Sequence, residues 1–376
     1  MDESIGSMNR NQKKIFLCIV FLSFFLGVEL TGKSLAQPPS PGSPEKTAPA
    51  HEIAYIDAHN HLSGLGRPGF PSDFPGAART ALAEMDQLGI GKILVMPPPF
   101  SPGHRGMFDI DDLVPVIQAY PDRLAALGGG GSLNVMIQAA GKSNSISPEL
   151  KDEFVKTAEA ILSKGAVGFG ELAVEHFSFR PEHPYESTPA DHPLFLLLAD
   201  IAARYNVPMD IHMEAVPKDM PLPDRKIFRR SGNNPKTLKA NIPAFERLLT
   251  HNRKTKIIWA HVGWCNTGFR TPVLCRELFS KHPNLYMSFK LAPESLPETR
   301  PISEDKQTIK PEWLQLIKDF PDRFIIGTDQ FYAAPGSRQI GPQKTEATKR
   351  LMTLLPPDLA GRIGVANPIR IFSLKE

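Results

Sequence analysis

The sequence predicts an α/β fold, a (β/α)₈ TIM barrel that forms a single domain after an N-terminal signal segment. From residue 51 onward, short apolar runs typical of strands alternate with longer helical patterns, over about the length that such a barrel needs. Several runs are almost continuously apolar, as parallel strands buried on both faces should be. A doubly wound open sheet is the alternative, but the sequence has no Gly-x-Gly-x-x-Gly fingerprint to support it.

The expected elements follow one another in regular order. The strand candidates are residues 53–57, 92–96, 123–127, 166–172, 208–212, 256–261, 284–289 and 323–328. The helix candidates are residues 77–88, 110–119, 148–164, 194–205, 243–250, 271–281 and 311–320, with 358–365 closing the chain. Asn-Val-Pro and His-Pro-Asn precede the fifth and seventh strands, where a turn from helix to strand is expected.

Residues 1–36 are predicted to be a signal peptide. Arg10, Lys13 and Lys14 precede an apolar run over residues 15–28, and the small residues Ser34 and Ala36 flank Leu35 before Gln37. A basic segment, a short apolar segment and a small-x-small site are typical of export signals. The run is short for a transmembrane helix, so no stable membrane span is expected in the mature chain, although an uncleaved anchor is the alternative.

The rest of the chain divides into a linker and one domain. Residues 37–50 are rich in Pro, Ser and Lys, which predicts a disordered linker, and residues 51–376 form the barrel. The protein is therefore expected to be exported, either periplasmic or secreted. Cys265 and Cys275 would remain in a compartment that permits disulfides, and the sequence leaves open whether they pair.

The amino-acid composition argues against nucleic-acid binding and is compatible with a globular enzyme. The chain has 376 residues, 41% hydrophobic and 22% charged, with a formal net charge of +3. This near-neutral balance does not indicate a nucleic-acid partner. Abundant proline, 37 residues, and long loops on a rigid scaffold fit an enzyme with a small-molecule substrate. Whether the chain forms a homo-oligomer is left open.

A His-x-His motif ends the first expected strand. Because side chains two positions apart in a strand share a face, His59 and His61 should aim their imidazoles at one point. Two neutral imidazoles placed in this way make half of a site for a divalent transition metal. Asp57 shares this face but lies deeper, so we expect a supporting or structural role for it.

Four more metal-ligand side chains end later strands: Glu171, His212, His261 and Asp329. The order His-x-His, Glu, His, His, Asp at the ends of strands one, four, five, six and eight resembles the amidohydrolase superfamily. The resemblance is strongest to its amidohydrolase-2, metal-dependent TIM-barrel group, and it covers residue 51 to about the C-terminus.

The resemblance implies a ligand set. His59 and His61 would bind the more buried metal with Asp329, and His212 would complete a mononuclear site or bind a second metal with His261. Glu171 stands where relatives often carry a bridging carboxylated lysine, so one or two ions remain possible. Zn²⁺ suits this mixture of imidazoles and carboxylates, and ligand type alone does not exclude Mn²⁺, Fe²⁺ or Co²⁺.

The expected chemistry is hydrolysis. A divalent cation lowers the pKa of bound water from about 15.7 to near 7. Asp329 would accept the water proton and pass it to the leaving group, while His261 helps to polarise the substrate carbonyl. The leading hypothesis is therefore a metal-dependent hydrolase that cleaves an ester, lactone or amide of a small molecule.

Two alternatives stay open. The same family includes metal-dependent decarboxylases of aromatic or unsaturated carboxylic acids, which tend to carry a glutamate in the first-strand motif. Here that motif is His59-Asn60-His61, which favours hydrolysis. The other alternative is a barrel that binds a metal and captures a ligand without turnover. The candidate substrate contacts are Trp264, Lys290, Glu214, Arg270 and His176.

Overall fold

The computed structural model describes residues 54–63, 73–143, 145–339 and 341–375. Residues 51–376 form a compact unit of their own. The predicted signal peptide (1–36) and linker (37–50) lie outside the described residues. No helix among the described residues is long and apolar enough to span a membrane.

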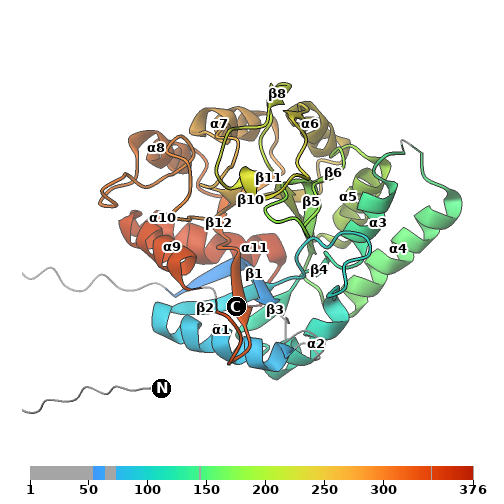
Figure 1. Ribbon diagram of the computed structural model, residues 1–376. Helices are drawn as coiled ribbons and strands as arrows, with labels where there is room; N and C mark the ends of the chain where they lie inside the picture. The colour runs from blue at the N-terminus through green and yellow to red at the C-terminus, as the bar shows by residue number, and fades with distance from the viewer. Residues whose placement is uncertain (1–53, 64–72, 144, 340, 376) are drawn as a thin grey trace, which may run out of the picture. The chain divides into compact units, whose positions relative to one another are not determined.

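Parallel strands form a closed barrel, as the sequence predicts (Figure 1). In chain order they are β1 (Tyr55–Ser63), β2 (Ile90–Val95), β3 (Leu124–Ala126) continued by β4 (Gly128–Gly129), β5 (Phe169–His176), β7 (Pro208–Met213), β10 (Lys256–Val262), β11 (Leu285–Phe289) and β12 (Phe324–Ile326). The third strand closes the barrel, because Leu127 N–H donates to Val95 on one side and Gly128 N–H donates to Gly168 on the other, at 3.0 and 3.2 Å.

Helices surround the barrel (Figure 1). They are α1 (Phe74–Leu88), α2 (Ile110–Ala119), α3 (Leu133–Ala140), α4 (Pro148–Ser163), α5 (Pro193–Tyr205), α6 (Ile242–His251), α7 (Pro272–Lys281), α8 (Pro311–Asp319), α9 (Gln343–Leu354), α10 (Pro357–Gly361) and α11 (Asn367–Phe372), with short turns η1 (Phe228–Arg230) and η2 (Arg362–Ala366). All the expected helices are present. Their starts follow capping chemistry: Ser147 and Thr271 accept hydrogen bonds from Leu150 and Leu274 in the first turns of α4 and α7, and proline follows each cap.

The first strand is longer than predicted. It extends to Ser63 because β13 (Gln330–Ala333) pairs with it in parallel from Asn60 to Ser63, whereas β12 pairs with it only at Asp57. His59 and His61 therefore lie within a hydrogen-bonded strand and not on a free loop. This pairing fixes the direction of both imidazoles.

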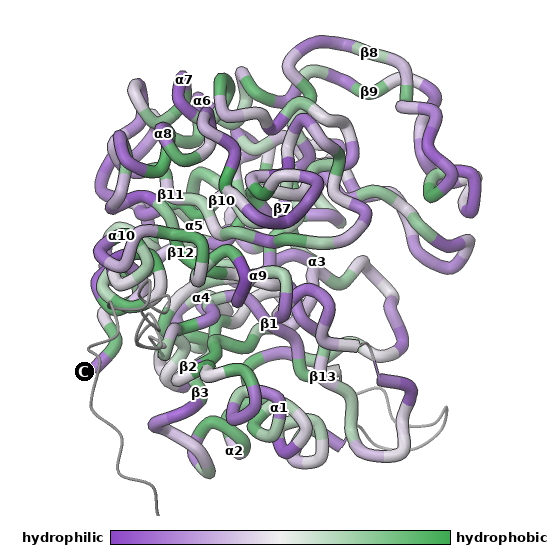
Figure 2. Tube along the Cα trace, turned by 90° about the vertical axis from the view of Figure 1, so that its left-hand side faces the viewer, coloured by the Kyte–Doolittle hydropathy of each residue, from purple (hydrophilic) through white to green (hydrophobic). Residues whose placement is uncertain are grey.

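Three other short strands lie outside the barrel. The segment between β5 and α5 contains β6 (Glu186–Ser187), which pairs antiparallel with β5. The segment after β7 contains β8 (Met220–Pro221) and β9 (Thr237–Leu238), which pair with each other. Figure 2 shows that this β8–β9 excursion is largely hydrophilic.

Two apolar clusters hold the barrel together. The larger one fills the space between the strands and the helices. The smaller one fills the lower interior of the barrel, where Ile56, Leu94, Ile258 and Ile325 pack with Phe372 of α11. α11 therefore closes the end of the barrel at which the strands begin. The polar side chains described next occupy the other end, where the strands finish.

Candidate metal centre

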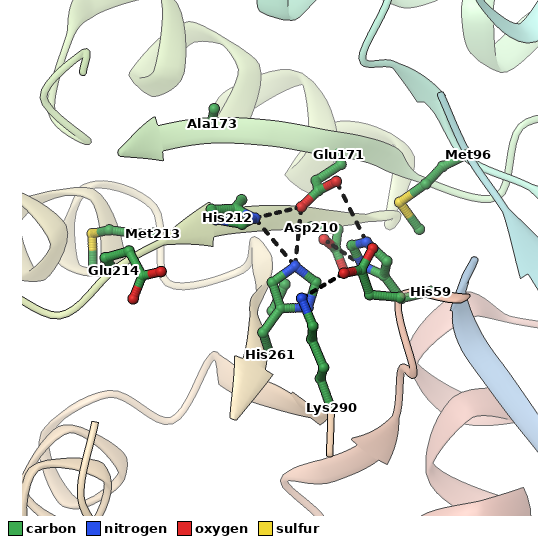
Figure 3. A network of polar contacts seen from close by, with 12 residues as sticks. His59, Met96, Glu171, Ala173, Asp210, His212, Met213, Glu214, His261 and Lys290 are labelled. Atoms are coloured by element: carbon green, nitrogen blue, oxygen red, sulfur yellow. Dashed lines mark hydrogen bonds and ion pairs between the residues drawn. The ribbon is translucent and has the colours of Figure 1, made fainter. Parts of the chain in front are cut away.

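The six side chains predicted to bind metal converge at the C-terminal end of the barrel, and Figure 3 shows four of them, His59, Glu171, His212 and His261. Each is buried, with Asp329 the most exposed at 9%. They come from five strands or the residues that follow them: His59, His61, Glu171, His212, His261 and Asp329. Their nitrogen and oxygen atoms form three overlapping groups, and within each group these atoms lie within 4.8 Å of one another.

Outer partners orient the two imidazoles of β1. Nδ1 of His61 lies 2.9 Å from the carbonyl oxygen of Met96, so its Nε2 faces Asp329 Oδ1 at 3.1 Å. Nδ1 of His59 lies 3.1 Å from Asp210 Oδ1, and its Nε2 faces Glu171. Asp210 was not among the site residues predicted from the sequence. Its signal is the two-residue spacing from His212, which places both side chains on one face of β7.

Glu171 lies at the middle of the cluster. Oε1 is 2.7 Å from His212 Nδ1 and 3.1 Å from His261 Nε2. Oε2 is 3.5 Å from Nε2 of both His59 and His61. Burial alone would raise the pKa of Glu171, but the neighbouring His59, His212 and His261 hold it well below its ordinary value. This carboxylate is therefore ionised.

Two lysines hold Asp329. Lys290 Nζ lies 2.5 Å from Asp329 Oδ2 and 3.7 Å from the centre of the Trp264 ring. Lys344 donates to the main-chain oxygen of Asp329 and lies 3.5 Å from Oδ2. Burial raises the pKa of Asp329, but the two ammonium groups outweigh burial and keep it well below its ordinary value. Asp329 is therefore a carboxylate that can accept a proton.

Two of the cluster residues have an unusual backbone conformation. His261 has a φ of 71° and Asp329 a φ of 55°, in the left-handed region that residues with a β-carbon rarely adopt. Asp329 is fixed there by its N–H, which donates to the His59 carbonyl at 2.8 Å. Such conformations persist where the surrounding structure enforces them, and they are common at functional sites.

The donor set fits a divalent cation. Nε2 of His59 and of His61 are buried and lack a hydrogen bond of good geometry, although carboxylate oxygens lie 3.1 to 3.5 Å away. Burial lowers the pKa of His59, but Asp210 and Glu171 raise it well above its ordinary value, so this position stabilises positive charge. Imidazoles and carboxylates are the side chains that Zn²⁺, Mn²⁺ and Fe²⁺ share as ligands.

The structure places three of the five predicted substrate contacts beside the cluster. Trp264 lies against His261, with ring centres 6.0 Å apart. His176 lies against His212, with ring centres 4.5 Å apart. Lys290 contacts Asp329 as described. Their contact with a substrate stays a prediction.

The other two predicted contacts are engaged by the protein itself. The carboxylate of Glu214 accepts hydrogen bonds from the main chain and side chain of Asn266, at 2.8 and 2.6 Å, and lies apart from the network in Figure 3. The guanidinium of Arg270 donates to the carbonyls of Ala260 and Met213. Both side chains therefore have partners within the protein, and their contact with a substrate stays a prediction.

Asp57 joins the first and last barrel strands. Its two oxygens accept from the main-chain N–H and the hydroxyl of Thr328, at 3.0 and 2.6 Å. It makes no contact with the ligand side chains of His61, Glu171 or Asp329 among the interactions of the described residues. This agrees with the expected structural role.

Residues 56–374 match the family model described as amidohydrolase. The chain belongs to the amidohydrolase family. It is an enzyme of that family by this match, and the cluster corresponds to the divalent-metal site that the resemblance implied. No curated protein matches this amidohydrolase.

Several solved structures are similar to this amidohydrolase at low identity. One is a probable 2-pyrone-4,6-dicarboxylic acid hydrolase from Acinetobacter baumannii (13% identity, 86% of this chain and 100% of that chain, TM-score 0.46). Another is 2,6-dihydroxybenzoate decarboxylase from Rhizobium (14% identity, 85% of this chain and 98% of that chain, TM-score 0.47). A third is 5-carboxyvanillate decarboxylase from Novosphingobium aromaticivorans, in complex with manganese and a nitrobenzoic acid (13% identity, 88% of this chain and 98% of that chain, TM-score 0.47). Similarities at this level do not identify the reaction of this amidohydrolase.

Proposed function

We propose that this protein is a metal-dependent hydrolase that cleaves an ester, lactone or amide of a small molecule. The observation that supports this most directly is the ionised Asp329 beside a buried cluster of four imidazoles and Glu171. The cluster provides ligands for a cation, and Asp329 provides a base at the same point.

The side chains that would hold the metal are His59, His61, Glu171, His212, His261 and Asp329. When bound, a divalent ion supplies a Lewis acid that polarises a carbonyl and acidifies water. Zn²⁺ is the proposed ion because it suits this ligand set, with Mn²⁺ or Fe²⁺ as alternatives. The position of Glu171 between the two histidine pairs favours two ions.

The roles of the protein groups follow from their charge states. Asp329 accepts a proton from the attacking water and returns it to the leaving oxygen or nitrogen, so that water is added across the broken bond. Lys290 and Lys344 keep Asp329 ionised and in place. Burial and the nearby Lys290 hold the pKa of His261 well below its ordinary value, so its imidazole is neutral and has one N–H to donate to the developing oxyanion.

Decarboxylation of an aromatic or unsaturated carboxylic acid is the second candidate. The paired ammonium groups of Lys290 and Lys344 beside the cluster would suit an anionic substrate. However, decarboxylation requires a proton donor to the carbon, and the low pKa of Asp329 keeps it ionised, so that it carries no proton to donate. Hydrolysis is therefore favoured.

The experiment is metal analysis of the purified protein, followed by a screen of esters, lactones, amides and aromatic acids. We expect bound divalent metal and release of an acid together with an alcohol or amine. Release of carbon dioxide without hydrolysis would establish the second candidate. Binding without turnover in the metal-loaded protein would indicate a non-catalytic barrel.

Variants test the assignment of roles. His59→Ala and His212→Ala should lose most bound metal, whereas His251→Ala, a change of an exposed histidine on α6, should keep it. Asp329→Asn should fold and lose on the order of a hundredfold or more in kcat, because it removes the base. Full metal occupancy in the first two variants, or an unchanged rate in the third, contradicts the assignment.

We also propose that the protein is exported to the periplasm or secreted, on the basis of the basic, apolar and small-residue pattern of residues 1–36. N-terminal sequencing of the protein from fractionated cells tests this. A mature N-terminus at Gln37 is the expected result, and an intact N-terminus in the cytoplasmic fraction opposes it.

A further inference from the structure

A buried carboxyl group with little hydrogen bonding lies on the segment between β5 and α5. Glu186 is 4% exposed, and among the described residues neither of its carboxyl oxygens makes a hydrogen bond of good geometry, although the Ser101 hydroxyl lies close enough to lower its pKa. Burial of a polar group without a good hydrogen bond costs free energy, so native proteins rarely keep such a group without a reason. Glu186 was not among the residues predicted from the sequence to form the site.

Glu186 faces the same side of the sheet as the metal centre. It lies directly opposite His176 in the antiparallel pairing of β6 with β5. Residues directly opposite each other in such a pair project their side chains to the same face. The ring of His176 contacts the ring of His212, and Nδ1 of His176 is also buried without a partner. Among the described residues, two buried polar groups with poor hydrogen bonding therefore lie on one face of the β5–β6 pair, and one of them borders the ligand cluster.

The electrostatic surroundings agree with this position. Burial raises the pKa of Glu186 to about 7, the negative charge of Glu171 adds to the increase, and the nearby Ser101 hydroxyl partly opposes it. The effect of Glu171 places Glu186 within electrostatic reach of the centre. The effect of Ser101 places it at the rim of the barrel, since Ser101 lies in the segment that follows β2.

We propose that Glu186, with His176 opposite it, binds a hydrogen-bond donor of the substrate, a hydroxyl or amino group at a distance from the bond that is cleaved. This inference rests on the proposed function, which places the bond that is cleaved at the ligand cluster. The carboxyl oxygens of Glu186 can accept from O–H or N–H, and the Ser101 hydroxyl engages at most one of them. A substrate with such a group donates a hydrogen bond to the buried carboxyl group. A substrate without it leaves the carboxyl group buried without that hydrogen bond and should bind less well.

The test compares three methyl esters with the metal-loaded protein: those of benzoic, 3-hydroxybenzoic and 3-(aminomethyl)benzoic acid. In the wild type we expect kcat/KM for the better polar ester to exceed that for the plain ester by about tenfold or more. In Glu186→Leu this ratio should fall to about one, whatever the change in absolute rate. The matched control is Glu182→Leu, which removes an exposed carboxylate from the same segment and should keep the wild-type ratio.

The two arms identify the donor. Glu186→Gln keeps an acceptor but loses the charge, so it should retain a preference for the hydroxyl ester and lose a preference for the aminomethyl ester. If Glu186→Leu does not fold or hold metal, this second variant decides. A wild-type ratio retained in both variants overturns the proposal, and so does a ratio near one in the wild type.

A binding measurement separates this inference from the proposed function. The three free acids are titrated into metal-loaded wild type and variants by calorimetry. If the wild type hydrolyses none of the esters but binds a polar acid about tenfold more tightly than benzoate, and Glu186→Leu loses this difference, the donor site stands and hydrolysis fails. Equal binding of all three acids to the wild type overturns the donor site.

Discussion

Oε1 of Glu171 lies 2.7 Å from Nδ1 of His212, and the other oxygen of the same carboxylate faces the two imidazoles of β1. One side chain thus connects ligand pairs that come from opposite sides of the barrel. The sequence left the number of metal ions open, and we propose two ions, to each of which Glu171 would supply a ligand oxygen.

Glu171→Gln should lower the metal content from two ions per chain to one. The amide removes the negative charge and one of the two acceptor oxygens, so it cannot hold two cations as the carboxylate does. Metal content is measured by elemental analysis after dialysis. Glu175→Gln is the matched control, a change of a buried carboxyl group four residues away that should leave the content unaltered. An equal stoichiometry in Glu171→Gln and wild type contradicts a bridging role.

Lys290→Met should shift the acidic limb of the pH–rate profile to higher pH. Lys290 helps to hold the pKa of Asp329 well below its ordinary value, so the loss of the ammonium group raises this pKa. Asp329 then becomes protonated, and inactive as a base, at a higher pH than in the wild type. The measurement is kcat/KM against pH, with the exposed Lys318→Met as control. An unmoved limb would show that Lys290 does not set the charge of Asp329.

Arg270→Met should destabilise the fold without removing metal. The guanidinium donates to two buried carbonyls, at the ends of β7 and β10, and stacks 4.2 Å from the centre of the Trp259 ring. The substitution removes a buried charged donor from both carbonyls and leaves Met213 only the Trp259 indole N–H, at 2.8 Å, so we expect a loss of about 2–5 kcal/mol in the free energy of unfolding. Urea denaturation measures this loss, and Arg276→Met, at a partly exposed ion pair with Asp319, should cost less than about 1 kcal/mol. A stable Arg270→Met with a raised KM would instead restore the predicted substrate contact.

Glu175 should make the fold less stable as the pH rises from about 4.5 to 7. Burial raises its pKa to about 7 from the ordinary 4.5, with Glu214 adding to the increase and Tyr185 and Asn241 opposing it. A raised pKa means that the folded state favours the proton, so the stabilisation is complete below pH 4.5 and is lost as the pH rises through 7.

The expected loss is at most about 3 kcal/mol of the free energy of unfolding. Glu175→Gln resembles the protonated acid and should lack this share of the pH dependence. Both proteins are unfolded with urea across this pH range, in the presence of a chelator so that metal binding does not contribute. Parallel stability curves for the two proteins would count against the assignment.

The alternation of strands and helices and the strand-end ligands were predictable because they depend on local pattern. Burial on both faces produces apolar runs such as Phe324–Ile326, and the common end of parallel strands brings His59 together with Asp329. The barrel could therefore be preferred over an open sheet from residue order alone.

Other features depend on tertiary contacts that the pattern does not contain. α9 was missed because its sequence is mostly polar and threonine-rich, so it lacks a clear apolar stripe, and Lys344 was missed with it. The position of Arg270 depends on two carbonyls from distant strands. Glu186 could not be identified from the sequence, because its burial without a hydrogen bond of good geometry depends on the tertiary structure.

The bond between Asp57 and Thr328 has a consequence for biosynthesis. The strand that leaves the ribosome first acquires its neighbours on one side, β12 and β13, only when almost the whole polypeptide has been made. Nascent chains that stop before Phe324 would leave one edge of β1 unpaired, although five of the six ligand side chains precede that point. Premature termination should therefore yield aggregation-prone fragments and not weakly active enzymes. The protein can fold and acquire activity only after translation is nearly complete.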